Sequence, residues 1–180
     1  PKTFIEFFDT GDDHFDNTFI SIFSKFIRIL CIMISLFLTS LYVAVVSFHS
    51  DILPPQYIIS LATSRATVPF NAFLEAFLME TVAEILREAS VRLPKQIGPA
   101  IGIVGTIVIG QASVSAGLVS PLLVIIVSLS IMSSFATADY SITNTIRVLK
   151  FLMIIVTSVF GLFGFTMGVI LITVNLCSMD

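Results

Sequence analysis

The chain has 180 residues, of which 56% are hydrophobic and 12% are charged, and its formal net charge is -3. Its mean hydropathy of +1.04 is far above that of a soluble domain, so the length is better divided into membrane spans of about 20 residues each, of which four or five fit. The weakly acidic charge without a basic stripe excludes a protein that binds nucleic acid.

The first 24 residues form an acidic segment in which carboxylates alternate with phenylalanines. We expect an amphipathic juxtamembrane segment over 1–24 and a membrane domain over 25–180. His14 stands among these acids, but the spacing is not that of a metal site, so a solvated acidic face is expected and no metal or other cofactor. Because the chain begins with Pro1 and stops at Asp180 directly after an apolar run, we also expect a piece of a longer protein.

Apart from Arg28 at the start, residues 27–48 are apolar except for hydroxyls, which can bond back to their own helix, and they are long enough to span a membrane. Lys25 and Arg28 lie at the start of this span, whereas His49 and Asp51 follow its end. Because Lys and Arg are enriched on cytoplasmic flanks, the start of the span is predicted to lie inside.

The segment 70–92 is predicted to be one amphipathic helix, because Pro69 suits a first helical turn and Pro94 stops the run. At about 100° per residue, three acids share one face of this helix, while Glu75 falls on the apolar side. The three acids are Glu80, Glu84 and Glu88.

Three interpretations of this helix stay open. It could lie at an interface, with solvated acids and a Glu88–Arg92 pair. It could cross the membrane with its acids turned toward the protein interior or an aqueous path, since carboxylates that face lipid are costly. Carboxylate pairs could also serve acid/base catalysis. The second interpretation places Arg87, Arg92 and Lys95 inside with the other cations and leaves only Arg65 outside.

The apolar tract 97–135 is interrupted by small and polar residues from Gln111 to Pro121, which indicates a turn. The tract could form two shortened spans, 97–119 and 121–135, that meet at an outer turn, or one broken helix. A last span is expected over 151–176, and its start is again basic.

Small residues recur one turn apart on two apolar segments, as Gly98-x-x-x-Gly102 and Gly164-x-x-x-Gly168. Such spacing lets helix backbones approach closely, so both pairs are predicted at helix contacts. Neither histidine accompanies a nucleophile in a known motif, and no glycine-rich loop precedes a helix in phosphate-binding form. The sequence therefore predicts no enzyme.

Four stretches of the chain carry a resemblance to the A subunit of GerA-type spore germination receptors, and the resemblance extends over essentially the whole chain. The stretches are SLYVAVVSFH (Ser40–His49), RATVPF (Arg65–Phe70), EAFLMETVAEILREASVRLPKQIGPAIGIVGTIVIGQASVSAGLVSP (Glu75–Pro121) and DYSITNTIRVLKF (Asp139–Phe151). One departure is Thr39, where the family often has proline.

This resemblance implies a protein of the spore inner membrane in endospore-forming bacteria, with a cytoplasmic domain before Pro1. It further implies partners, namely a transporter-like B subunit and a C lipoprotein, besides the surrounding membrane lipid. The A subunits of the family are expected to oligomerise with copies of themselves into an ion-conducting pore that opens on nutrient sensing.

A cation pore needs polar or acidic groups on a protein-facing surface, which makes Glu80, Glu84 and Gln111 candidates for an ion path. Glu75 would hold a neighbouring helix or subunit, and Arg87 with Glu88 would form a pair at the cytoplasmic end. With them, Arg92 and Arg65 complete the set of polar residues expected to stabilise or gate the structure.

Two other functions remain as alternatives, a permease for a small solute and a non-conducting membrane scaffold. A permease predicts internal repeats, and the sequence has no matching pair of interrupted spans. The predicted fold class is all-α, a polytopic helical membrane protein with about four to five embedded helices, because lipid-exposed backbone must satisfy its own hydrogen bonds and no barrel-like alternation is present.

Overall fold

The computed structural model describes residues 18–92, 94, 97–136 and 140–178. In these ranges every regular element is a helix and no strand is present, which confirms the predicted all-α class. Residues 1–17 of the predicted acidic segment lie outside the described residues, and 18–24 begin the first helix. The helices are α1 (Thr18–Phe48), the short 3₁₀ helix η3 (Ser50–Ile52), α2 (Pro55–Arg65), α3 (Ala72–Val91), α4 (Gly98–Ser115), α5 (Pro121–Ser134) and α6 (Tyr140–Cys177).

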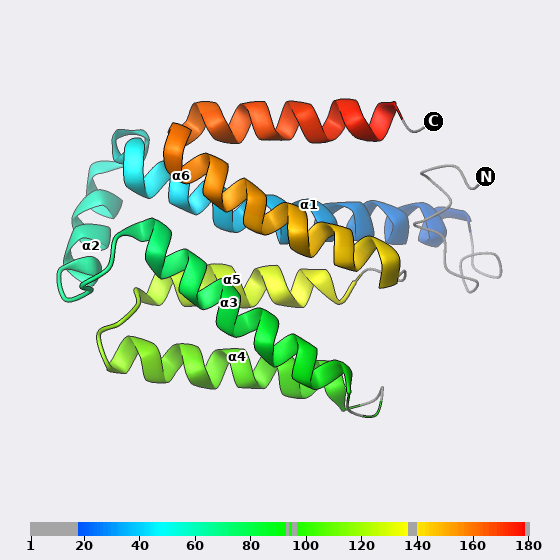
Figure 1. The fold of residues 1–180 in the computed structure, drawn as a ribbon, viewed down its shortest axis with the longest axis horizontal. Coiled ribbons are helices and arrows are strands. Elements are labelled where there is room, and N and C mark those ends of the chain that lie inside the picture. Colours follow the sequence, from blue (N-terminus) through cyan, green and yellow to red (C-terminus); the bar gives the residue numbers. More distant parts are fainter. Residues whose placement is uncertain (1–17, 93, 95–96, 137–139, 179–180) are drawn as a thin grey trace.

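The long helices lie side by side as a bundle, and α2 closes one end of it (Figure 1). Successive long helices run in opposite directions, so the end of α1 and the start of α3 share the α2 end, whereas the ends of α3 and α5 lie at the other. The beginning of α6 also lies at this second end. The cations of α1, α3 and α6 therefore gather away from α2, and Arg65 alone among the described cations lies at the α2 end.

The tract 97–135 contains two helices rather than one broken helix. Helix α4 ends in a Schellman motif, in which the N–H of Leu118 donates to the carbonyl of Ser113 and that of Gly117 to Val114, both at 2.9 Å. Gly117 has φ 70°, the left-handed conformation that this motif requires and that glycine adopts without strain. The chain then turns, and Pro121 begins α5 at a position that suits proline.

Helix α6 differs from the continuous span expected over 151–176. Gly161 has φ 61° and ψ -141°, which no helical residue adopts, and at this point the chain reverses so that the last segment runs back along the bundle (Figure 1). Close approach of the two segments requires glycine, since a Cβ on Gly164 would lie 2.7 Å from the carbonyl oxygen of Val156 and one on Gly168 would meet the Met153 sulfur. These glycines thus hold a hairpin within one chain.

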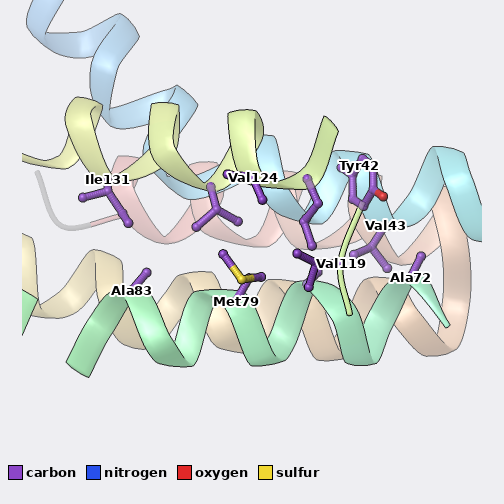
Figure 2. Close-up of a cluster of buried hydrophobic side chains, with 11 residues drawn as sticks. Tyr42, Val43, Ala72, Met79, Ala83, Val119, Val124 and Ile131 are labelled. Carbon is purple, nitrogen blue, oxygen red and sulfur yellow. The ribbon is translucent and has the colours of Figure 1, made fainter. Parts of the chain in front are cut away.

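A buried apolar cluster joins α1, α3 and α5 in the middle of the bundle (Figure 2). Met79 and Ala83 of α3 face Val124 and Ile131 of α5, and Val43 of α1 contributes from the side. Small residues on α3 let the three helices approach one another closely. A second cluster joins α1 to both segments of α6, where the rings of Phe37 and Phe165 meet edge to face at 6.0 Å.

The distribution of side chains is the reverse of that in a soluble protein. Large apolar side chains cover the outside, such as Ile85 (64% exposed), Val108 (60%) and Leu171 (63%), whereas Glu75 and Glu80 are fully buried. Three of the described helices contain apolar stretches long enough to cross a membrane. These stretches are Phe19–Phe48, Gly98–Ser115 and Thr143–Asn175, of which the last is divided by the reversal at Gly161.

Candidate functional site

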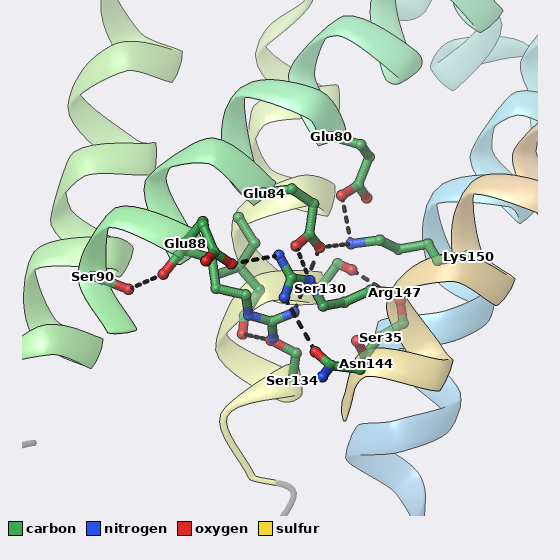
Figure 3. A network of polar contacts seen from close by, with 12 residues as sticks. Ser35, Glu80, Glu84, Glu88, Ser90, Ser130, Ser134, Asn144, Arg147 and Lys150 are labelled. Carbon is green, nitrogen blue, oxygen red and sulfur yellow. Dashed lines mark hydrogen bonds and ion pairs between the residues drawn. The ribbon is translucent and has the colours of Figure 1, made fainter. Parts of the chain in front are cut away.

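The acidic face of α3 lies against α6 and forms an ion-pair network there (Figure 3). The amino group of Lys150 lies 2.7 Å from Oε2 of Glu80 and 3.2 Å from Oε1 of Glu84. One turn earlier on α6, Nε of Arg147 donates to Oε2 of Glu84 at 2.6 Å. A second nitrogen of Arg147 lies 3.5 Å from Glu88. Lys150 and Arg147 thus bridge all three acids of that face.

The spacing of the charges along the two helices explains this pairing. The acids recur every four residues along α3, and Arg147 and Lys150 are three residues apart on α6, so each set forms one stripe on its helix. Packing the two stripes together places a base between each successive pair of acids. Beside these charges, α3 and α6 also meet through an aromatic pair, Phe77 and Phe151, whose ring centroids are 5.5 Å apart.

Arg87 adds a third base to the network from α3 itself. Its guanidinium lies 3.5 Å from Glu84 and 5.4 Å from the ring centroid of Phe135, a geometry suited to a cation–π contact. The expected pair of Arg87 with Glu88 therefore differs from the observed pairing, in which Glu88 contacts Arg147. Three acids and three bases leave the network formally neutral.

Exposure rises steadily along the acidic face of α3. The side chain of Glu80 is 0% exposed, that of Glu84 13% and that of Glu88 53%. Lys150 is 2% exposed, so its pair with Glu80 is almost completely removed from solvent. A buried pair of this kind offsets the desolvation of its two charges only while both partners are present.

Thr39 of α1 completes the surroundings of Glu80. Its hydroxyl donates to Oε1 of Glu80 at 2.5 Å, while Oε2 faces Lys150. Both carboxylate oxygens therefore have a partner, one from α1 and one from α6. The hydroxyl of Thr39 therefore links α1 to the ion-pair network of α3 and α6.

Glu75 forms a separate cluster near the α2 end of the bundle, which we call the Glu75 cluster. It is fully buried, its Oε1 accepts the backbone N–H of Ser120 at 2.5 Å, and its Oε2 lies 3.3 Å from a guanidinium nitrogen of Arg65. The hydroxyl groups of Tyr42 and Ser120 are 3.1 Å apart. Glu75 thus ties α2 and the start of α5 to α3, so it contacts neighbouring helices of its own chain.

The remaining sequence-predicted residues lie apart from these clusters. Gln111 is exposed on α4, and Arg92 is exposed at the end of α3; in the described part of the chain, neither joins an ion pair. Lys95 lies outside the described residues. Gly98 and Gly102 are buried on α4, and a Cβ on Gly102 would lie 3.2 Å from the Ser90 hydroxyl of α3.

Sequence reasoning missed Lys150, Thr39 and Ser120 as partners of the buried acids. Lys150 belongs to the basic start expected for the last span, and its three-residue spacing from Arg147 matches the acidic stripe of α3. Only that complementary spacing could have indicated the pairing. The site holds acids of α3 and bases of α6 as ion pairs. Among the described residues, no group of three or more His, Cys, Asp or Glu side chains is placed to hold a metal ion.

Comparison with known proteins agrees with the resemblance seen in the sequence. The family model described as Bacillus/Clostridium GerA spore germination protein matches residues 1–180. Spore germination protein KA of Bacillus subtilis (strain 168) is 42% identical over 99% of this chain and 33% of its own length. Spore germination protein GerQA of Bacillus cereus is 44% identical over 91% of the chain and 33% of its own length.

A third relative, Spore germination protein GerLA of Bacillus cereus, is 37% identical over 99% of this chain and 36% of its own length. The chain thus spans about a third of the length of the curated relatives it matches. No solved structure matches it. A match over every residue, carried by a bundle with apolar outer surfaces, shows that the chain is a helical membrane protein of the GerA spore germination family.

Proposed function

We propose that this chain is the membrane part of a germinant-receptor subunit that triggers spore germination, and that several copies surround an ion-conducting pore. Membership of the GerA family supports the receptor role, since similar proteins over nearly the whole chain are named spore germination proteins. In this proposal the subunit works in the spore inner membrane with a transporter-like B subunit and a C lipoprotein.

The observation that carries the pore proposal is the polar strip along α3. Its acids pass from 53% exposed at Glu88 through 13% at Glu84 to 0% at Glu80, so a charged surface begins at the end of the bundle and continues into it. Charged groups at membrane depth are expensive and mark ion paths in many membrane proteins. Because each acid is neutralised here, we assign this arrangement to a non-conducting state.

A conducting state would then need the bases of α6 to withdraw from the acids of α3. Glu84 is the informative residue, because it contacts Lys150, Arg147 and Arg87 at once. In the Glu84→Gln variant Lys150 keeps Glu80, and Arg147 keeps Glu88, so the bundle retains a partner for both bases of α6. The variant therefore tests the effect of a charge in the ion path, with little effect on folding.

The experiment compares ion release after nutrient addition in spores that carry the Glu84→Gln variant or the wild-type protein. We expect at least a roughly tenfold slower release, while the B subunit still copurifies with the variant, because the open path loses a carboxylate that a passing cation would contact, and one charge contact of about 1.5–3 kcal/mol corresponds to that factor or more. Arg92→Gln, an exposed residue at the end of the same helix that lies apart from the charged strip, is the matched control and should release ions at a nearly normal rate.

Three outcomes would contradict the proposal. Normal ion release by the Glu84→Gln spores would remove the acids from the path. Liposomes that contain the full-length protein with its partners and still conduct no ions would favour a non-conducting scaffold. Uptake of labelled solute by the same liposomes would favour a permease instead.

A further inference from the structure

A cavity of about 550 Å³ lies beside the Glu75 cluster, at the α2 end of the bundle. Its walls come from the end of α1, from α2, from the start of α3 and from the part of α6 just before Gly161. Cavities of this size commonly bind small ligands, mostly through apolar walls with a few polar groups that fix orientation. The described cavity has this composition.

The polar groups that line the cavity are mainly hydrogen-bond donors. Arg65 is the charged residue among them, and Asn71 contributes an amide whose oxygen already accepts the N–H of Leu74 at 2.9 Å, which leaves its amino group for another partner. The hydroxyl groups of Ser47 and Ser50 also line it. Since no lining residue is acidic, the polar part of the cavity suits an anion.

The rest of the cavity wall is apolar. Phe48, Leu53, Ile58, Leu61 and Phe73 line it. A second cavity of about 590 Å³ shares Val46, Leu53 and Leu61 with it but has no charged lining residue. Arg65 therefore distinguishes the first cavity, and a ligand there would need both an anionic group and an apolar body.

Arg65 has donors left for such a ligand. One guanidinium nitrogen lies 3.3 Å from Oε2 of Glu75, and a guanidinium carries five N–H donors in a planar fork. The Arg65 side chain is 17% exposed, whereas Glu75 behind it is fully buried and has its other oxygen on the N–H of Ser120. An anion in the cavity would thus share Arg65 with Glu75 and compete for it.

We propose that this cavity binds an anionic amphiphile, whose carboxylate or phosphate contacts Arg65 and whose apolar body lies against Phe48, Ile58 and Leu61. Two sources share this chemistry, a soluble carboxylate with a short hydrocarbon chain and an anionic phospholipid. The site is independent of the ion-pair network of α3 and α6, and its test measures binding rather than ion release, so its failure would leave the proposed function untouched.

The experiment measures binding of octanoate to the full-length protein, with octanol as the uncharged probe of the same length. Octanoate should bind more tightly than octanol, and Arg65→Gln should weaken octanoate binding by about 10- to 100-fold, the range expected for one charge-assisted contact. Glu75→Gln should bind octanoate more tightly than the wild type, because it frees Arg65 from its internal partner. Arg92→Gln, an exposed cation on α3, should change nothing.

Loss of folding is separated from loss of the site by the double variant Arg65→Gln/Glu75→Gln, which leaves no unpaired buried charge and should still fail to bind octanoate. The two sources are separated in nanodiscs. Weaker octanoate binding in phosphatidylglycerol than in phosphatidylcholine assigns the site to a lipid headgroup, and equal binding assigns it to a soluble anion. Equal affinity for octanol and octanoate, or octanoate binding by Arg65→Gln at wild-type strength, would overturn the proposal.

Discussion

The pair between Lys150 and Glu80 offers the sharpest test of the ion-pair network, because the two partners differ in what they retain after substitution. In Lys150→Met, Glu80 keeps only the hydroxyl of Thr39 and stays in a site with 0% exposure. Removal of one partner of a buried ion pair typically costs about 3–5 kcal/mol. We expect Lys150→Met to fall in this range.

The converse substitution, Glu80→Gln, should be milder. Lys150 then retains Glu84 at 3.2 Å, and the amide of glutamine can still accept from Thr39. The loss is that of one charged hydrogen bond, about 1.5–3 kcal/mol. The double variant removes both charges together, so it should be more stable than Lys150→Met alone by about 1–2 kcal/mol, because no unpaired carboxylate remains buried.

The assay is reversible unfolding of the full-length protein in mild detergent by titration with sodium dodecyl sulfate, followed by circular dichroism. Arg92→Met serves as the control, since Arg92 is exposed at the end of α3 and its replacement should change the free energy of unfolding by less than about 0.5 kcal/mol. Equal losses in the two single variants, or strictly additive losses in the double variant, would refute the assigned pairing.

Three further predictions use the same unfolding assay. Gly161→Ala should destabilise the protein by about 1–3 kcal/mol, because a residue with a side chain is strained at its φ of 61° and ψ of -141°. Gly105→Ala is the control and should be neutral or stabilising, because its Cβ would lie 3.4 Å from its nearest neighbour, an ordinary contact. Gly110→Ala should cost about 1–3 kcal/mol, since its Cβ would lie 2.5 Å from Val124, and Val124→Ala in the same chain should recover part of it. Asn71→Ala should cost about 1 kcal/mol through the lost cap on the Leu74 N–H, and no loss would show that the cap contributes nothing.

Local signals in the sequence located most of the helices. Pro94 follows the end of α3, and the small polar run before Pro121 marked the turn between α4 and α5. Pro69 was expected in the first turn of α3, but the helix begins at Ala72 and is capped by Asn71. These residues act through their own backbone preferences, which need no knowledge of the surrounding fold. For the same reason the acids of α3 could be placed on one face before any neighbour was known.

Pairing between helices could not be predicted in this way. The face of α3 that carries Glu80 and Glu84 is fixed by helical periodicity, but the identity of the opposing helix depends on how the whole bundle packs. Gly161 illustrates the same limit, because Gly161 and Gly164 both lie between apolar residues in the sequence. Of these two glycines, Gly161 alone adopts a positive φ, and a Cβ there would lie 3.0 Å from the ring of Phe48, a neighbour that the local sequence does not reveal.

The place of α3 within the bundle depends on charge neutralisation as well as on its apolar contacts with α1 and α5. Helix α3 is not among the described helices that are apolar enough to cross a membrane on composition alone, since four acids and Arg87 interrupt it. An unpaired carboxylate or cation at membrane depth is unfavourable by about 2.5–3.5 kcal/mol on insertion scales. Arg65 offsets this for Glu75, and the two bases of α6 do so for the other acids. The position of α3 therefore depends on segments before and after it in the chain, which bring the opposite charges to its two ends.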